Sequence, residues 1–338
     1  MRELTDCPAN GLTSIRGTGD QPGNSSGELT GMVLRIERTS IHDGQGLRTV
    51  IFLKGCPLRC AWCSTPESQR PEPERGYVPA RCEGCGLCVR ACPAGALALS
   101  AQDGKVSLDP AKCRHCFTCA AKCPHNAVKP YGRLLSVTET VREISKDEIF
   151  FFYSGGGVTI SGGEPLNQAG FVAEVLRQCR ELGIHTALET SFYAPFESIQ
   201  SILPWLDVLY VDIKHMTEEA HRHWVGVSNS LILDNLRKAD SSEDSPDIIL
   251  RLPLIPGVND SDENLAAVAE FCQSLRRLQE IELLPYHRLG LETYKSLQKD
   301  YPLQDLVPPQ RERVRERAVF LARQVPAVPV RAGGELVK

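Results

Sequence analysis

The sequence predicts an α/β fold, a partial (β/α)6 TIM-like barrel that carries a small inserted domain. Apolar strand-like runs alternate with amphipathic helical stretches after residue 131, which is typical of βα units and a parallel sheet. Polar residues and glycines follow directly on several of these runs, where the ligand site of such folds lies. Residues 73–130 differ from their surroundings, because they are cysteine-rich, punctuated by proline and built from short elements.

The alternating pattern sets the expected elements. Helices are expected over 137–147, 167–182, 195–202, 228–239, 261–278 and 309–324. Strands are expected over 49–54, 157–161, 185–189, 207–213, 248–255 and 281–286. About six strands are fewer than the eight of a complete (β/α)8 barrel, so we expect an incomplete one. A doubly wound sheet is the competing interpretation, and periodicity does not separate the two.

The chain divides into three expected parts. Residues 1–30 read as a disordered tail, because the stretch from Gly17 to Gly31 is rich in Gly, Ser and Thr. Residues 31–72 and 131–334 form the barrel, and 73–130 form the insert. The formal charge of −4 gives no reason to expect nucleic acid or an anionic membrane as partner. We find no apolar run of about 18 residues and no secretory signal.

Cysteine usage indicates metal clusters rather than disulfides. Of fourteen cysteines, eleven stand in tight runs, and Cys7, Cys179 and Cys272 stand alone. Neighbours in such runs bridge one another poorly, but they can converge on one metal cluster. In a long chain without an export signal this favours a reducing, oxygen-poor cytoplasm.

The first run follows the strand expected at 49–54 and contains Cys56, Cys60 and Cys63, a CxxxCxxC pattern. Three thiolates can hold three irons of a [4Fe–4S] cubane, and the fourth iron then keeps an open position for a ligand. A zinc knuckle, or a fourth cysteine supplied from elsewhere, is the alternative interpretation.

The insert contains one motif twice, offset by 31 residues from Cys82 to Cys113. Each copy is C-x2-C-x2-C-x3-C-P, the pattern of bacterial two-cluster ferredoxins, in which the fourth cysteine serves the other cluster. Zinc is the alternative, but three ligands crowded into one turn suit a cubane better. We therefore expect a ferredoxin-like domain with two [4Fe–4S] clusters. The expected ligands are Cys82, Cys85, Cys88 and Cys123 for one, and Cys113, Cys116, Cys119 and Cys92 for the other.

The three-cysteine run and the segment IHDGQGLRTVIFLKGCPLRC that contains its start resemble the activating enzymes of glycyl radical enzymes, in the radical S-adenosylmethionine superfamily. The resemblance extends from about Val33 to Gly334. It implies that the open iron binds S-adenosylmethionine and that the reduced cluster cleaves it reductively. The resulting 5′-deoxyadenosyl radical would take a hydrogen atom from a glycine of a partner enzyme, generating a glycyl radical.

The resemblance also implies which residues bind the cofactor. In the family the Gly-Gly-Glu segment contacts the amino group of S-adenosylmethionine. The Asp-x-Lys segment also contacts the cofactor, and a histidine lies near its adenosine. Ser64-Thr65 replaces the His-Asn of many relatives, so a contact there would come through the backbone. For Asp212 and Lys214 a simple surface ion pair is the alternative. The expected residues are Trp62, Cys63, Ser64, Gly162, Gly163, Glu164, Asp212, Ile213, Lys214 and His287.

Several further segments are tied to the resemblance less directly. Glu189–Ser191 and Arg251 map near the site in relatives, and Trp224–Ser228 resembles a family segment without a derivable role. Pyruvate formate-lyase activase lacks the insert, so the chain resembles branches that activate other glycyl radical enzymes. The segment CSTPESQ from Cys63 resembles the isethionate sulfite-lyase branch.

Our hypothesis for the insert is an electron relay from a reduced ferredoxin or flavodoxin. Two other classes stay open from the sequence. One is an electron-transfer polyferredoxin, against which the unpaired three-cysteine run counts. The other is a radical S-adenosylmethionine enzyme that acts on a small molecule, against which the segment before Cys56 counts.

Overall fold

The computed structural model describes residues 27–337. The disorder expected for residues 1–26, and Cys7 with it, lies outside the described residues. The expected tail extends too far, since Thr30 and Gly31 already belong to a strand. They pair with Ser136 and Leu135, and these hydrogen bonds to a neighbouring strand fix their conformation.

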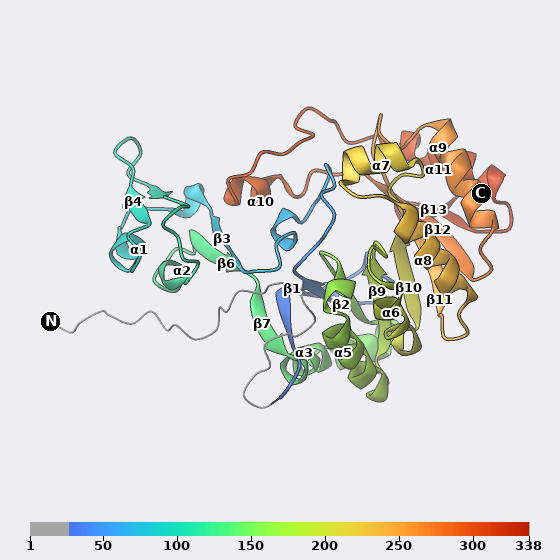
Figure 1. Cartoon of the computed structure of the whole chain (residues 1–338), viewed down its shortest axis with the longest axis horizontal. Coiled ribbons are helices and arrows are strands. Elements are labelled where there is room, and N and C mark those ends of the chain that lie inside the picture. Colours follow the sequence, from blue (N-terminus) through green and yellow to red (C-terminus); the bar gives the residue numbers. More distant parts are fainter. Residues whose placement is uncertain (1–26, 338) are drawn as a thin grey trace.

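A ten-stranded mixed sheet dominates the described part of the chain (Figure 1). Its order is β14-β13-β12-β11-β10-β9-β8-β2-β1-β7. The strands are β1 (Thr30–Ser40), β2 (Arg48–Leu53), β7 (Arg133–Ser136), β8 (Gly157–Gly162), β9 (His185–Thr190), β10 (Val208–Asp212), β11 (Asp247–Leu254), β12 (Leu278–Pro285), β13 (Val330–Ala332) and β14 (Glu335–Val337).

The topology favours the incomplete barrel over the doubly wound sheet. From β2 through β8, β9, β10, β11 and β12 to β13, neighbouring strands are parallel and follow the order of the chain. A doubly wound sheet would reverse its strand order at a switch point, and this one does not. The six expected strands are all present. The sequence prediction missed the antiparallel strands β1, β7 and β14 and the short parallel strand β13.

Helices cover the outer side of the curved sheet (Figure 1). Six correspond to expected ones: α3 (Val137–Ser145), α5 (Ala169–Glu181), α6 (Phe196–Gln200), α8 (Ser230–Ser241), α9 (Asp262–Gln273) and α11 (Arg311–Gln324). Alternation along the strands explains the two sides. In β8, Val158 and Ile160 point into the apolar core beneath the helices, which leaves Thr159 and Ser161 for the inner side. The inner side is therefore available for polar chemistry.

Outside residues 74–131, three of the described helices were not expected, namely α4 (Glu148–Ser154), α7 (Glu218–Val225) and α10 (Leu291–Ser296). Each is eight residues or shorter, so helical periodicity is weak in all of them. No helix among the described residues is both long and apolar enough to cross a membrane.

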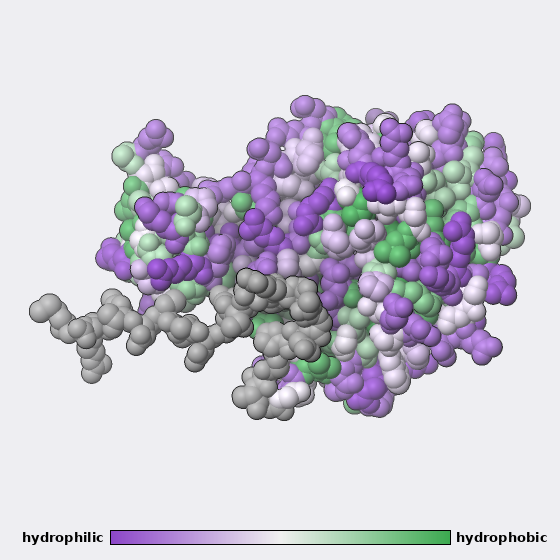
Figure 2. Space-filling view, in the orientation of Figure 1, coloured by the Kyte–Doolittle hydropathy of each residue, from purple (hydrophilic) through white to green (hydrophobic). Residues whose placement is uncertain are grey.

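Residues 74–131 form a separate lobe at one side of the sheet (Figure 2). Two antiparallel two-stranded sheets and two single-turn helices build it: β3 (Glu74–Tyr77) with β6 (Val128–Tyr131), β4 (Leu97–Leu99) with β5 (Val106–Leu108), α1 (Leu87–Arg90) and α2 (Thr118–Ala121). The lobe has an apolar cluster of its own, which includes Tyr77, Leu97 and Val128. The pair β3–β6 lies between the rest of the lobe and the large sheet (Figure 1).

Candidate active site

The three-cysteine loop begins where β2 ends, and its backbone is tied to α7. The N–H of Arg59 donates to the carbonyl of Val225 (2.7 Å), and that of Ala61 to the carbonyl of Trp224 (2.9 Å). Gly226 ends α7 with φ +87°, a left-handed conformation that glycine adopts without strain. The segment around Trp224, which had no role that could be derived from the sequence, therefore holds the loop in place.

A second set of backbone bonds fixes the start of the same loop. The N–H of Gly55 donates to Ser68 (2.7 Å) and that of Cys56 to Gln69 (3.0 Å). Ser68 ends the short 3-10 turn η1 (Pro66–Ser68), which follows the third cysteine. The loop thus closes on itself, and its three cysteines have a defined geometry before any ligand is bound.

The three thiols lie in an apolar setting with one cation facing them. Burial, and then the Glu164 carboxylate, raise the pKa of Cys56 to about 12. Burial also raises the pKa of Cys60 to about 12 and that of Cys63, while the Lys214 ammonium opposes the shift at both. A buried thiolate needs a positive partner, which bound iron would supply.

The donor set suits a polynuclear cluster. None of the thirteen cysteines of residues 27–337 forms a disulfide. No three His, Cys, Asp or Glu side chains in that range lie close enough together to bind a single metal ion. A cubane does not require such convergence, because each thiolate binds a different iron. The residues present therefore fit a [4Fe–4S] cluster at the three-cysteine loop.

Two glycines let the end of β8 approach this loop. Gly162 has φ +121°, and a Cβ on Gly163 would lie 2.5 Å from the carbonyl oxygen of Gly55. In return the N–H of Glu164 donates to that carbonyl (2.8 Å). Any other residue at position 163 would push the strand end away from the cysteines.

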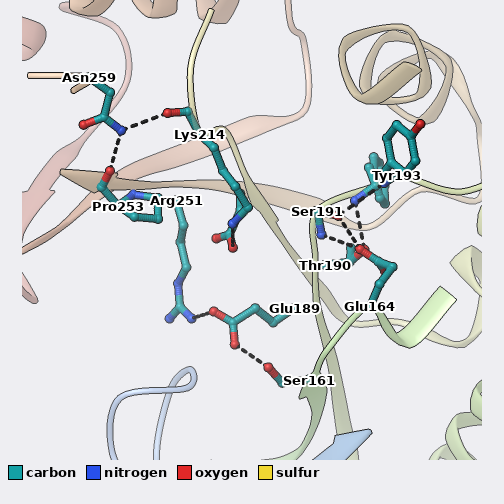
Figure 3. A network of polar contacts seen from close by, with 12 residues as sticks. Ser161, Glu164, Glu189, Thr190, Ser191, Tyr193, Lys214, Arg251, Pro253 and Asn259 are labelled. Carbon is teal, nitrogen blue, oxygen red and sulfur yellow. Dashed lines mark hydrogen bonds and ion pairs between the residues drawn. The ribbon is translucent and has the colours of Figure 1, made fainter. Parts of the chain in front are cut away.

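The Glu164 carboxylate points toward Thr190 and Ser191 at the end of β9 (Figure 3). It accepts hydrogen bonds from the Thr190 hydroxyl, from the N–H and hydroxyl of Ser191, and from the N–H of Leu166. Burial raises the pKa of Glu164, and the bonds from Ser191 and Thr190 oppose that shift. The side chain therefore joins the ends of β8 and β9.

Asp212 is the last residue of β10 and Lys214 follows the strand; the two form a mostly buried ion pair, with 2.9 Å between Nζ and Oδ2. Burial lowers the pKa of Lys214, but Asp212 and Cys60 outweigh it and raise the pKa above its usual value. Oδ1 of Asp212 is buried and has no hydrogen-bond partner within the described residues. An acceptor in this state costs free energy unless a ligand donates to it, which fits a bound cofactor with amino or hydroxyl groups. The simple surface ion pair is excluded, since the Lys214 side chain is only 9% exposed.

The residue between them, Ile213, is buried in the main core, and its N–H donates to the carbonyl of Arg251 (2.9 Å). The carbonyl of Lys214 accepts from Asn259 Nδ2 (2.9 Å), which also donates to Pro253 (2.7 Å; Figure 3). Backbone contacts on both sides therefore fix the direction of the Lys214 side chain.

A charged network crosses the inner side of the barrel below this pair. Arg251 donates to Glu189 (2.7 Å) and to Glu282 (3.0 Å), and Glu189 also accepts from the Ser161 hydroxyl (2.8 Å; Figure 3). The Arg251 guanidinium lies over the Tyr210 ring, 4.2 Å from its centroid. Sequence reasoning missed Glu282 and Asn259. A charged residue in the apolar strand β12 was the available signal for Glu282.

The residues expected near the adenosine, Trp62, Ser64 and His287, do not form a buried cluster as Asp212 and Lys214 do. Trp62 is buried against Leu58 and Tyr286, so its ring belongs to the packing around the loop. Ser64 and His287 are exposed. A Cβ on Gly290 would lie 2.7 Å from the Ser64 carbonyl oxygen, so the end of the cysteine loop touches the segment after His287.

In the lobe the two cysteine runs exchange their fourth members. One cavity is lined by Cys82, Cys85, Cys88 and Cys123. The other is lined by Cys92, Cys113, Cys116 and Cys119. Each cavity thus has four thiols from two runs, as in the crossed pattern expected from the sequence.

Comparison with known proteins gives the family. Residues 110–269 match the Radical SAM superfamily and residues 81–127 the 4Fe-4S dicluster domain. The isethionate sulfite-lyase activating enzyme of Nitratidesulfovibrio vulgaris is 42% identical over 82% of this chain and 90% of its own. The trans-4-hydroxy-L-proline dehydratase activating enzyme of Clostridioides difficile is 43% identical over 84% of this chain and 94% of its own.

Among solved structures, a radical SAM methyltransferase from Sphaerobacter thermophilus has the same fold, with a TM-score of 0.50, 16% identity, and coverage of 91% of this chain and 74% of that one. The curated relatives are activating enzymes and share most of their length with this chain. These matches exclude a polyferredoxin and support the expected class over an enzyme of small molecules. The chain belongs to the glycyl radical enzyme activating enzymes of the radical SAM superfamily.

Proposed function

We propose that this chain activates an isethionate sulfite-lyase by generating a glycyl radical on it. The observation that carries the reaction type is the three-thiol loop facing the Asp212–Lys214 pair, in which Asp212 Oδ1 has no hydrogen-bond partner in the part of the chain that the structure describes. The choice of partner is supported by the relative of that name and by the segment from Cys63 to Gln69.

A second partner is favoured by a specific observation. The relative named for trans-4-hydroxy-L-proline dehydratase is as similar as the one named for isethionate sulfite-lyase, with 43% and 42% identity. Overall identity therefore does not separate the two partners, and a direct test must include both.

We assign the three loop cysteines to a [4Fe–4S] cluster with one open iron. Such a cluster supplies the electron that cleaves S-adenosylmethionine into methionine and a 5′-deoxyadenosyl radical. The chain's own contribution is to bind and orient the cofactor. In this proposal the backbone of Gly162–Glu164 faces the amino group, Asp212 Oδ1 accepts a hydrogen bond, and Lys214 binds the carboxylate. Trp62, Ser64 and His287 surround the adenosine.

We assign two further [4Fe–4S] clusters to the cavities of the lobe, which gives three clusters in all. Their role in this proposal is to carry electrons from a reduced ferredoxin or flavodoxin in an anaerobic cytoplasm. The domain boundaries at 31–72, 73–130 and 131–334 are part of the same proposal. It is supported by the four thiols in each cavity and by the match to a dicluster domain.

The test is activation in vitro. The chain is reconstituted anaerobically with iron and sulfide, then mixed with S-adenosylmethionine, a reductant and either isethionate sulfite-lyase or trans-4-hydroxy-L-proline dehydratase. We expect the doublet of a glycyl radical in the electron paramagnetic resonance spectrum of the first partner. A doublet only in the second would transfer the assignment to it. No doublet in either, with intact clusters, would contradict both choices of partner.

A further inference from the structure

Strand β3 presents its two faces to two different parts of the molecule. Glu74 and Gly76 face the barrel side. Glu74 accepts from Lys54 Nζ and from Lys299 Nζ, each at 3.4 Å, and Gly76 packs against Tyr131. Arg75 and Tyr77 alternate with these residues, so they point to the opposite face. That face carries the cysteine cavities.

Arg75 lines the cavity of the second cysteine run together with Cys92, Cys113 and Cys119. It is 91% buried, since only 9% of the residue is exposed. Its Nε and Nη1 have no hydrogen-bond partner within the described residues. The Cys119 and Cys113 thiols lie within electrostatic reach of its guanidinium.

No carboxylate is paired with Arg75 among the described residues, and a buried, unpaired guanidinium is costly. Burial accordingly lowers the pKa of Arg75, and the thiols of Cys119, Cys113 and Cys88 oppose that shift. A thiolate-bound iron–sulfur cluster carries net negative charge and sulfur acceptors. It would therefore supply the missing acceptors for the N–H groups of both nitrogens, Nε and Nη1.

We propose that Arg75 sets the reduction potential of the cluster held by Cys92, Cys113, Cys116 and Cys119. The inference rests on the proposed function, which places a [4Fe–4S] cluster in that cavity. Reduction adds one electron, supplied by the external ferredoxin or flavodoxin, and makes the cluster more negative. A cation and N–H donors against its sulfurs stabilise the reduced state, so Arg75 raises the potential.

The cavity of the first run is lined by Arg81 and His125, but Arg81 is exposed, so none of the residues lining it presents a buried guanidinium. The next residue on the same face of β3 is Tyr77, whose hydroxyl lies beside Cys82. Its hydroxyl is neutral and can donate one hydrogen bond. Arg114 also lines the second cavity, but its side chain is exposed, where solvent and salt screen its charge. Arg75 is therefore the side chain with the largest expected effect, and Arg114 gives a matched control in the same cavity.

The experiment uses the full chain with Cys56, Cys60 and Cys63 replaced by serine, so that the clusters of the lobe are observed alone. Redox titrations followed by electron paramagnetic resonance give two one-electron transitions. Arg75→Gln should shift one of them toward lower potential and leave the other in place. We expect about a tenfold change in the ratio of oxidised to reduced cluster at fixed potential, or about 59 mV. Arg75→Lys keeps the positive charge, so its potential should lie close to that of the parent. Arg114→Gln should change the potential only a little.

Two results would overturn the proposal. One is an unchanged pair of transitions in Arg75→Gln, and the other is an equal shift of both. Iron analysis separates a failure of the Arg75 inference from a failure of the proposed function. If the proposed function fails, the chain with only the three loop cysteines replaced should hold fewer than about eight irons. If Arg75→Gln loses the second cluster, Arg75→Lys decides. A retained cluster near the parent potential supports the role of charge, and loss in both variants shows a structural residue instead.

Discussion

The three-cysteine loop and the two cavities of the lobe present cysteines in opposite ways. The loop offers three half-buried cysteines, a facing ammonium from Lys214 and a buried acceptor, Asp212 Oδ1, which has no hydrogen-bond partner within residues 27–337. Each cavity of the lobe offers four thiols. In the cavity of the first run, one of the four cysteines, Cys85, is exposed. Three thiols beside an unsatisfied acceptor describe a site that takes a ligand. Four thiols close the coordination of a cluster, so such a site is suited to carrying electrons.

The largest expected effect tests the loop side of this comparison. Cys60→Ser should reduce glycyl radical formation to background, because two thiolates hold a cubane poorly. About four irons per chain should be lost, and the clusters of the lobe should remain. Iron analysis and electron paramagnetic resonance check both statements.

The matched control for Cys60→Ser is Cys272→Ala. Cys272 is more deeply buried than Cys60, but it belongs to the apolar core contacts of α9 and lies outside every cysteine run. Its variant should keep the full iron content and radical yield. A glycyl radical formed at normal yield by Cys60→Ser would contradict the assignment of the loop.

The next effect tests whether the unpaired acceptor Asp212 Oδ1 contributes to ligand binding at the loop. Asp212→Asn removes the charge that faces Lys214 and weakens the acceptor. Loss of one partner from a buried charge pair costs about 2–5 kcal/mol, so affinity for S-adenosylmethionine should fall at least tenfold. Calorimetric titration of the reconstituted protein measures it.

Asp234→Asn is the matched control, because Asp234 and Lys238 form an ion pair of similar length, 2.7 Å, on an exposed helix face. Exposed pairs contribute little, so affinity should stay unchanged. Equal affinity in the Asp212 and Asp234 variants would show that the pair at the loop is merely structural.

A third effect tests the lobe. Cys116→Ser should slow reduction of the loop cluster by reduced ferredoxin or flavodoxin without abolishing it, and affinity for S-adenosylmethionine should not change. Stopped-flow spectroscopy with each donor measures the rate. Dithionite serves as the control reductant, since it is small enough to reach the loop cluster directly. An unchanged rate with the protein donors would contradict the relay.

The sequence predicted the six central strands well, and with them the polar residues at the strand ends. Buried parallel strands are continuous apolar runs, and polar residues follow them where the strands end. It did not predict the antiparallel edges. The antiparallel strand β14 and the parallel strand β13 beside it are three residues each, too short for a pattern. The eleven-residue β1 contains charged residues and two register shifts against β2, which mask alternation.

For the site, residue types were predictable, but the direction of side chains was not. Glu164 stands in a segment that predicts ligand contact, yet its carboxylate bonds to Thr190 and Ser191. Those partners lie on another strand, and local sequence says nothing of them. The anchoring of the loop by Trp224 and Val225 is hidden for the same reason, since backbone carbonyls leave no mark on residue type.

The smallest effect concerns that anchoring. Gly226 and Gly155 both end helices in the left-handed conformation, with φ +87° and +69°. Alanine at either position should lower the free energy of unfolding by about 1 kcal/mol through backbone strain. They differ in their surroundings, because a Cβ at 226 would lie 3.2 Å from Cβ of Arg59, whereas one at 155 would meet no atom within 4 Å.

Gly226→Ala should therefore displace Arg59 and with it the backbone between Cys56 and Cys60, while Gly155→Ala should not. The expected difference is a slower reconstitution of the loop cluster in Gly226→Ala at equal loss of stability, followed by absorbance near the charge-transfer bands of the cluster. Thermal unfolding of both variants before reconstitution provides the comparison. Equal reconstitution rates would mean that the loop is fixed by its bonds to Ser68 and Gln69 alone, and that α7 contributes nothing to the geometry of the three thiols.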